Sequence, residues 1–119
     1  MTNEQFWSQL RSLIDPKTTI SCKAISSLFF KAMQEDLSLL IVHRDGTLQS
    51  LLENGLTYAY CVTDWYDPVP SDCSIADAEL DGFFFHLFEH GYNGLGFLID
   101  GALIGIEWKD LMLADKKDT

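Results

Sequence analysis

The hydrophobic pattern of this chain changes its period near residue 36, and this change restricts the fold more than any other feature. Over residues 3–14 and 20–35, apolar side chains recur every three or four positions, which is the spacing of one helix face. Thr2-x-x-Gln5 resembles a capping box before the first helix, and Pro16 ends it. After residue 36, short apolar runs alternate with turn signals. The pattern predicts two helices followed by a mostly β region.

Three strands are expected in succession after the helices, over residues 37–43, 47–53 and 56–63. Arg44-Asp45-Gly46 is a turn signal between the first two, and Asn54-Gly55 is a strong hairpin signal between the second and the third. Apolar side chains alternate with others along the third strand, which gives it one apolar face. We expect these strands to form an antiparallel β-meander.

The remaining chain is expected to add one core helix and a C-terminal β-hairpin. Ser74-x-x-Asp77 resembles a helix start, and the helical stripe that follows consists of Leu80, Phe83, Phe84, Leu87 and Phe88. Strands at 95–99 and 103–107 flank an Asp-Gly turn, 108–113 is expected to be a short helical turn, and 116–119 a disordered end. We therefore expect one α+β domain over residues 1–119.

The charge of this 119-residue chain is strongly negative and unevenly distributed. The formal net charge is −10, and no Lys or Arg occurs between Arg44 and Lys109. A surface of one sign repels nucleic acid and anionic membranes, and it attracts basic partners. We expect a basic protein partner, no nucleic acid and no membrane.

The distribution of apolar residues and cysteines predicts a cytoplasmic protein. Residues 1–20 lack a basic segment followed by an apolar one, and no apolar run approaches the roughly 20 residues of a membrane span. Cys22, Cys61 and Cys73 are widely spaced and form no Cys-x-x-Cys pair. We expect three reduced thiols.

Several local patterns occur in a recognisable order between Leu37 and Leu113. They are the Asp-Gly turn, a strand ending in Val-Thr-Asp, an acidic loop, a helix, the run Gly-Leu-Gly-Phe-Leu-Ile-Asp, and Lys-Asp-Leu. This order resembles the N-terminal domain of SseB-type bacterial proteins. Small acidic domains of this kind also resemble immunity proteins of bacterial toxin systems. Both resemblances imply protein binding, and neither implies catalytic residues in this chain.

Two patterns resemble catalytic sites. His86-x-x-Glu89-His90 matches the H-x-x-E-H pattern, in which two histidines one helical turn apart bind zinc. The third ligand of such sites is a carboxylate far downstream, for which little chain remains. Carboxylate pairs such as Asp64 and Asp67 share one solvated environment, whereas acid–base catalysis needs two different ones. We expect no catalytic residue, no metal and no cofactor, and hence no enzyme.

The loop at residues 64–72 is the most distinctive segment. It places two large aromatic residues among acids, and its two prolines restrict the backbone. Aromatic residues anchor protein interfaces, and neighbouring acids steer a basic partner and pair with it. The alternative is that Trp65 packs into the core and Tyr66 is half exposed. The predicted partner-binding residues are Asp64, Trp65, Tyr66, Asp67, Asp72, Asp77 and Asp81.

These features together favour an immunity protein that is monomeric when free and neutralises a basic bacterial toxin. A nuclease is the expected toxin class, because a cleft that holds polyphosphate is cationic and an acidic surface can occupy it. One alternative is an acidic secretion chaperone, which would be a dimer with a hydrophobic groove for an unfolded effector segment. The other is an SseB-like regulatory module that binds proteins.

Overall fold

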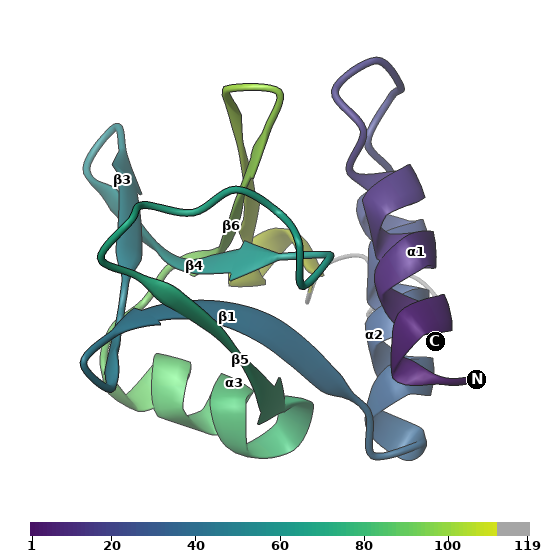
Figure 1. Ribbon diagram of the computed structural model, residues 1–119. Coiled ribbons are helices and arrows are strands. Elements are labelled where there is room, and N and C mark those ends of the chain that lie inside the picture. The colour runs from purple at the N-terminus through teal and green to yellow at the C-terminus, as the bar shows by residue number, and fades with distance from the viewer. Residues whose placement is uncertain (112–119) are drawn as a thin grey trace.

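The structure, a computed structural model, describes residues 1–111 and combines helices with a mixed β-sheet (Figure 1). The expected α+β class is confirmed. In chain order the elements are α1 (Asn3–Leu13), α2 (Cys22–Gln34), β1 (Ser38–Arg44), β2 (Thr47–Leu48), β3 (Ser50–Glu53), β4 (Leu56–Val62), β5 (Ser74–Glu79), α3 (Leu80–Glu89), β6 (Gly94–Ile99) and β7 (Ala102–Glu107).

Both N-terminal helices begin at caps that satisfy free backbone N–H groups. The Thr2 hydroxyl accepts the N–H of Gln5 at 3.1 Å, while the Gln5 side chain accepts the N–H of Thr2 at 2.8 Å. Ser21 caps α2 by accepting the N–H of Ala24 at 3.2 Å. These bonds replace intrahelical partners that the first turn lacks. The helices expected over residues 3–14 and 20–35 are confirmed.

Strand β1 lies inside the sheet and is paired along both edges. Strand β5 covers one edge in antiparallel register, from Ser38 opposite Glu79 to His43 opposite Ser74. Strands β4 and β2 share the other edge. Gln49 lies at the bend between β2 and β3 and belongs to neither strand. Its N–H donates to the Val42 carbonyl on β1 at 2.9 Å.

Both antiparallel pairs of the predicted meander are confirmed, but the strands do not form a simple meander, because β1 also pairs with β4. The segment expected as one strand at 47–53 bends at Gln49, so β3 leaves β1 and pairs with β4. This bend lets β1 pair directly with β4, and β6 then joins β4 in parallel. The sheet is therefore mixed. The two-residue turns have left-handed backbone at both positions, as type I′ hairpins require, at Asp45-Gly46, Asn54-Gly55 and Asp100-Gly101.

The predicted helix start at Ser74-x-x-Asp77 is wrong, because residues 74–79 form strand β5. An unpaired edge of β1 would leave a row of backbone donors and acceptors without partners, and a full ladder satisfies them. The hydrogen bonds between β1 and β5 together stabilise the fold more than one helix-capping bond would. Helix α3 begins at Leu80 instead, after Glu79, which makes no side-chain capping bond.

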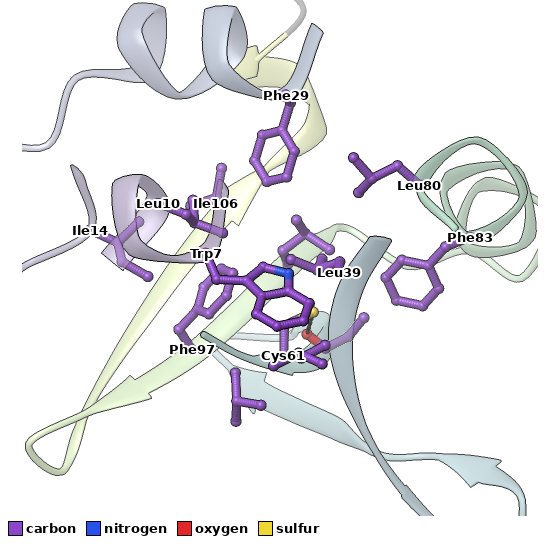
Figure 2. Packing of buried hydrophobic residues seen from close by; sticks show 14 of the residues in the cluster. Trp7, Leu10, Ile14, Phe29, Leu39, Cys61, Leu80, Phe83, Phe97 and Ile106 are labelled. Carbon is purple, nitrogen blue, oxygen red and sulfur yellow. Dashed lines mark hydrogen bonds between the residues drawn. The ribbon is translucent and has the colours of Figure 1, made fainter. Parts of the chain in front are cut away.

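The three helices and the sheet enclose a continuous hydrophobic core (Figure 2). Trp7 and Leu10 of α1 lie near Phe29 of α2 and Phe97 of β6 in this core. The indole Nε1–H of Trp7 donates to the backbone carbonyl of Ser38 at 2.8 Å. The bond satisfies the polar atom of a buried aromatic side chain and ties α1 to the start of β1.

Helix α3 buries a narrower stripe than the sequence predicts. Leu80, Phe83 and Leu87 are buried, and Phe84 is half-buried. Phe88, which was expected in the core stripe, is 52% exposed. A helix of this length that meets the core with one face cannot bury every apolar residue of a sequence this rich in phenylalanine.

The described chain ends in a helical turn that begins at Trp108, where such a turn was expected. The end of that turn at residue 113 and the disordered end predicted at 116–119 lie outside the described residues. Within residues 1–111, no helix has both the length and the apolar character needed to cross a membrane.

Three glycines allow β4, β6 and β7 to approach closely. A Cβ added at Gly96 would lie 2.8 Å from Cβ of Tyr58, and one at Gly105 would lie 2.6 Å from Cζ of the same residue. A Cβ at Gly94 would overlap the backbone carbonyl of Ile106 on β7. Only a residue without a side chain fits these positions.

We expect Gly94→Ala to lower the free energy of unfolding by about 2 kcal/mol or more, because β6 and β7 must separate to admit the methyl group. Gly82→Ala is the matched control: Gly82 lies inside α3 with nothing within 4 Å of an added Cβ. Alanine there should stabilise the protein by roughly 0.5–1 kcal/mol through helix propensity. Urea unfolding measures both. A Gly94→Ala protein as stable as wild type would contradict the packing of β6 on β7.

Candidate functional site

The predicted binding loop begins directly after β4, and its own acids fix its first turn. Asp64 Oδ1 accepts the backbone N–H of Tyr66 at 2.8 Å, and the Asp64 carbonyl accepts the N–H of Asp67 at 3.1 Å. Asp67 Oδ2 accepts the N–H of Thr63, also at 3.1 Å. Side-chain bonds of this kind hold a turn in one conformation. Both carboxylates therefore have a structural role as well as a charge.

The two aromatic residues of the loop differ in exposure. Trp65 is 46% exposed, and its ring stands edge-on to the buried ring of Trp7 with centroids 6.0 Å apart. Trp65 thus matches neither the interface prediction nor the core prediction fully, because one part of its side chain contacts the core and the other part is in solvent. Tyr66 is 94% exposed, which is more than the half exposure expected for it in the core alternative. Trp65 therefore connects Tyr66 and its loop to the core.

A hollow of about 470 Å³ lies between this loop and α1, and we call it the loop hollow. Carboxylates of Glu4, Asp64 and Asp67 line it, together with the two aromatic residues of the loop. Arg11 of α1 also lines it, so the hollow contains one cation among its acids. Residues 3–13 are far from the loop in sequence, and no local pattern marks Trp7 or Arg11 as its neighbours.

Asp72 forms an ion pair with Arg44, which lies just before the acidic stretch in the sequence. Arg44 at the end of β1 donates to Asp72 Oδ2 at 3.0 Å. This hydrogen bond from Arg44 is the main reason that the pKa of Asp72 lies below its ordinary value. The stretch between Arg44 and Lys109 contains no Lys or Arg, but the fold brings a cation from outside it next to Asp72.

The other predicted partner-binding residues lie away from the loop hollow. Asp77 is on β5, at the opposite edge of β1 from β4. Asp81 is in the first turn of α3, and its carboxylate lies within 4.8 Å of those of Asp36 and Glu79. These three exposed residues form what we call the acidic cluster. The structure thus gathers Asp64, Trp65, Tyr66 and Asp67 in one surface and leaves Asp72, Asp77 and Asp81 outside it.

The histidines of the H-x-x-E-H pattern lie one turn apart on α3, as expected. Their ring centroids are 4.2 Å apart, and both residues are exposed. Among the described residues, the acidic cluster is the one group of three or more metal-ligating side chains whose ligand atoms lie within 4.8 Å of one another. No third ligand therefore accompanies His86 and His90 there. The absence of a bound metal stays a prediction.

A second exposed surface was not predicted from the sequence. Side chains of α2, α3 and the C-terminal helical turn form a shallow depression of about 190 Å³, which we call the aromatic groove. Its lining is almost entirely apolar and consists of Ser26, Phe29, Phe30, Met33, Phe84, Phe88, Trp108 and Leu111. The sequence contains one signal for this surface, a run of three phenylalanines on α3. Consecutive residues of a helix point about 100° apart. The run Phe83-Phe84-Phe85 therefore cannot lie on a single buried face.

All three cysteines are free thiols. Cys61 is fully buried, and desolvation raises its pKa above the ordinary range. Desolvation also raises the pKa values of Cys22 and Cys73, with smaller contributions from nearby acids. Thiolates, rather than thiols, act as nucleophiles.

We expect Cys61 not to react with a thiol reagent in the folded protein, and Cys22 and Cys73 to react more slowly than free cysteine. All three should react at once in denaturant, because unfolding removes the desolvation. Mass spectrometry of the labelled protein identifies the sites, and Cys22→Ser with Cys73→Ser isolates Cys61. Rapid labelling of Cys61 without denaturant would contradict its burial.

Comparisons with protein-family models, with curated proteins and with solved structures found no match to this chain. The resemblance to SseB-type domains and to immunity proteins therefore remains a prediction from the sequence pattern alone.

Proposed function

We propose that this protein is an immunity protein that binds a basic toxin domain in the cytoplasm and neutralises it. The observation that carries the proposal is the exposed ring of Tyr66, 94% in solvent on a turn held by three hydrogen bonds. A partner that covers this ring removes apolar area from water, and the fixed turn loses little entropy on binding. Aromatic anchors of this kind dominate the binding energy of many interfaces.

The charge of the protein supports a basic partner. Glu4, Asp64 and Asp67 surround the loop hollow, and the chain has a net charge of −10. Opposite charges on two proteins raise the rate at which they meet. A nuclease toxin fits this surface, because its cleft has to hold polyphosphate and is cationic. Arg11 adds a requirement for specificity, since the partner should place a hydrogen-bond acceptor opposite its guanidinium.

The secretion chaperone and the regulatory module remain the second candidates, and the aromatic groove is the observation that favours them. A chaperone of that class would be a stable dimer, whereas the inhibitor is expected to be a monomer. Analytical ultracentrifugation of the purified protein separates these two cases.

We expect Tyr66→Ala to weaken binding to the toxin by about 2 kcal/mol or more, roughly thirtyfold in Kd, without a change in melting temperature. Trp65 is a poorer probe, because its removal also takes away the contact with Trp7. Leu52→Ala is the matched control, since Leu52 on β3 is also a large exposed apolar residue and lies outside the loop hollow. Calorimetry with a basic toxin domain, sought among the products of the neighbouring genes, measures each variant.

The electrostatic part of the proposal has its own readout. We expect the association rate to fall as salt rises from low to physiological concentration, because exposed charges are screened beyond about 8 Å at physiological ionic strength. Stopped-flow fluorescence measures this rate. If Tyr66→Ala binds the toxin and protects cells as well as wild type does, the loop is not the binding site. A rate that does not change with salt would remove the role of charge.

A further inference from the structure

The aromatic groove joins two large exposed aromatic side chains, Phe30 and Phe88, in one apolar depression. Phe88 is 52% exposed at its edge, and its ring lies 5.1 Å from that of Trp108. Phe84 lies between Phe29 and Trp108, with centroid distances of 5.6 Å and 5.2 Å. The floor of the groove is thus a packed set of rings from three separate segments. Contiguous apolar surface that is open to solvent is available for a partner to cover.

The size and lining of the groove indicate anchor side chains rather than a small ligand. Its volume of about 190 Å³ is below the roughly 300–1,000 Å³ of typical small-molecule pockets. The side-chain hydroxyl and indole N–H groups in the lining are already bonded: Ser26 Oγ donates to the Leu111 carbonyl at 3.0 Å, and Trp108 Nε1–H donates to the Tyr92 carbonyl at 2.9 Å. A bound group would therefore be held by apolar contact.

The acidic cluster lies at one end of this groove. Asp36 lies two residues after the end of α2, and its backbone N–H donates to the carbonyl of Met33, a groove residue, at 3.2 Å. Asp81 precedes Phe84 by three positions on α3, a spacing that places two residues on the same side of a helix. The N–H of Leu80 donates to the Leu37 carbonyl at 3.3 Å and holds these two helix ends together. Two cations lie nearby, the N-terminal ammonium group of Met1 and Lys31, and both interact with Glu35.

We infer that the aromatic groove binds an amphipathic helix of a partner protein, with apolar side chains along one face and Lys or Arg at one end. Two helices that flank an apolar groove accept a third helix through anchors at positions i, i+3 or i+4, and i+7. The cations at the end of that helix would then lie beside the acidic cluster. This binding surface goes beyond the proposed function, because no residue that lines the aromatic groove also lines the loop hollow.

A second copy of this chain fits the groove less well than a basic helix. In a symmetric dimer the same surface meets itself, so each groove would face its own equivalent. Two chains that each have a net charge of −10 would then approach each other. Repulsion between like charges opposes such a dimer and favours a partner of opposite charge.

The experiment uses the full-length protein and a labelled synthetic peptide of about 18 residues, or roughly five helical turns. The peptide has leucines along one face and arginines at one end, and a control peptide has glutamates in place of the arginines. Fluorescence anisotropy measures the binding of each. We expect the arginine peptide to bind and the glutamate peptide to bind at least about tenfold more weakly, since only the former complements the acidic cluster.

Two variants on α3 provide matched readouts. Phe88→Asp should weaken binding of the arginine peptide at least about tenfold, because it places a charge in the groove. Phe85→Asp is the control, since Phe85 is 66% exposed on the same helix and does not line the groove. Asp81→Lys should weaken the arginine peptide and not the glutamate peptide. Circular dichroism checks that each variant is folded.

Three results would overturn the inference. One is a folded wild-type protein that binds neither peptide. Another is equal loss of binding in Phe85→Asp and Phe88→Asp. The third is a stable dimer that Phe88→Asp dissociates, because the occupant of the groove would then be a second copy. Tyr66→Ala should leave peptide binding unchanged, so failure of the loop surface and failure of the groove are distinguishable.

Discussion

The hydrogen bonding of strand β1 along both edges is the constraint on which the rest of the structure depends. Strand β5 occupies one edge, while β4 and β2 share the other. Because β4 and β5 follow each other in the chain, the segment at 63–73 must pass from one side of β1 to the other (Figure 1). A segment that makes this crossing over the surface is free of regular pairing. The exposed loop with its two aromatic residues is therefore a consequence of how β1 is paired.

The elements that could be predicted from the sequence are those determined by local chemistry. Helix caps, hydrophobic spacing and Asx-Gly turns act within a few residues, and they located both N-terminal helices and every two-residue hairpin turn correctly. The errors arose where a distant segment decides. Ser74-x-x-Asp77 has the letters of a helix cap, but the free edge of β1 makes it a strand. The bend at Gln49 likewise depends on partners in two other strands.

The candidate site divides in the same way. The loop could be found from its composition, since aromatic residues, acids and prolines occur within a few positions of one another. Its surroundings could not, because Arg11 and Trp7 reach it only through the packing of α1. The pairing of Asp72 with Arg44 could not be predicted either, because two hairpins separate these residues in the sequence. A charge run along a chain predicts a charged surface only after the fold has brought in cations from elsewhere.

Strand β5 has a further consequence for how molecules of this protein meet in a crowded solution. It pairs with β1 along one edge, and no other described strand pairs with its opposite edge. An open edge is a template for another extended chain, and charged side chains are a common protection against such addition. Asp77 and Glu79 supply two negative charges on this short strand, and a second molecule approaching edge to edge would bring the same two. These acids therefore protect the sheet from aggregation through its edge.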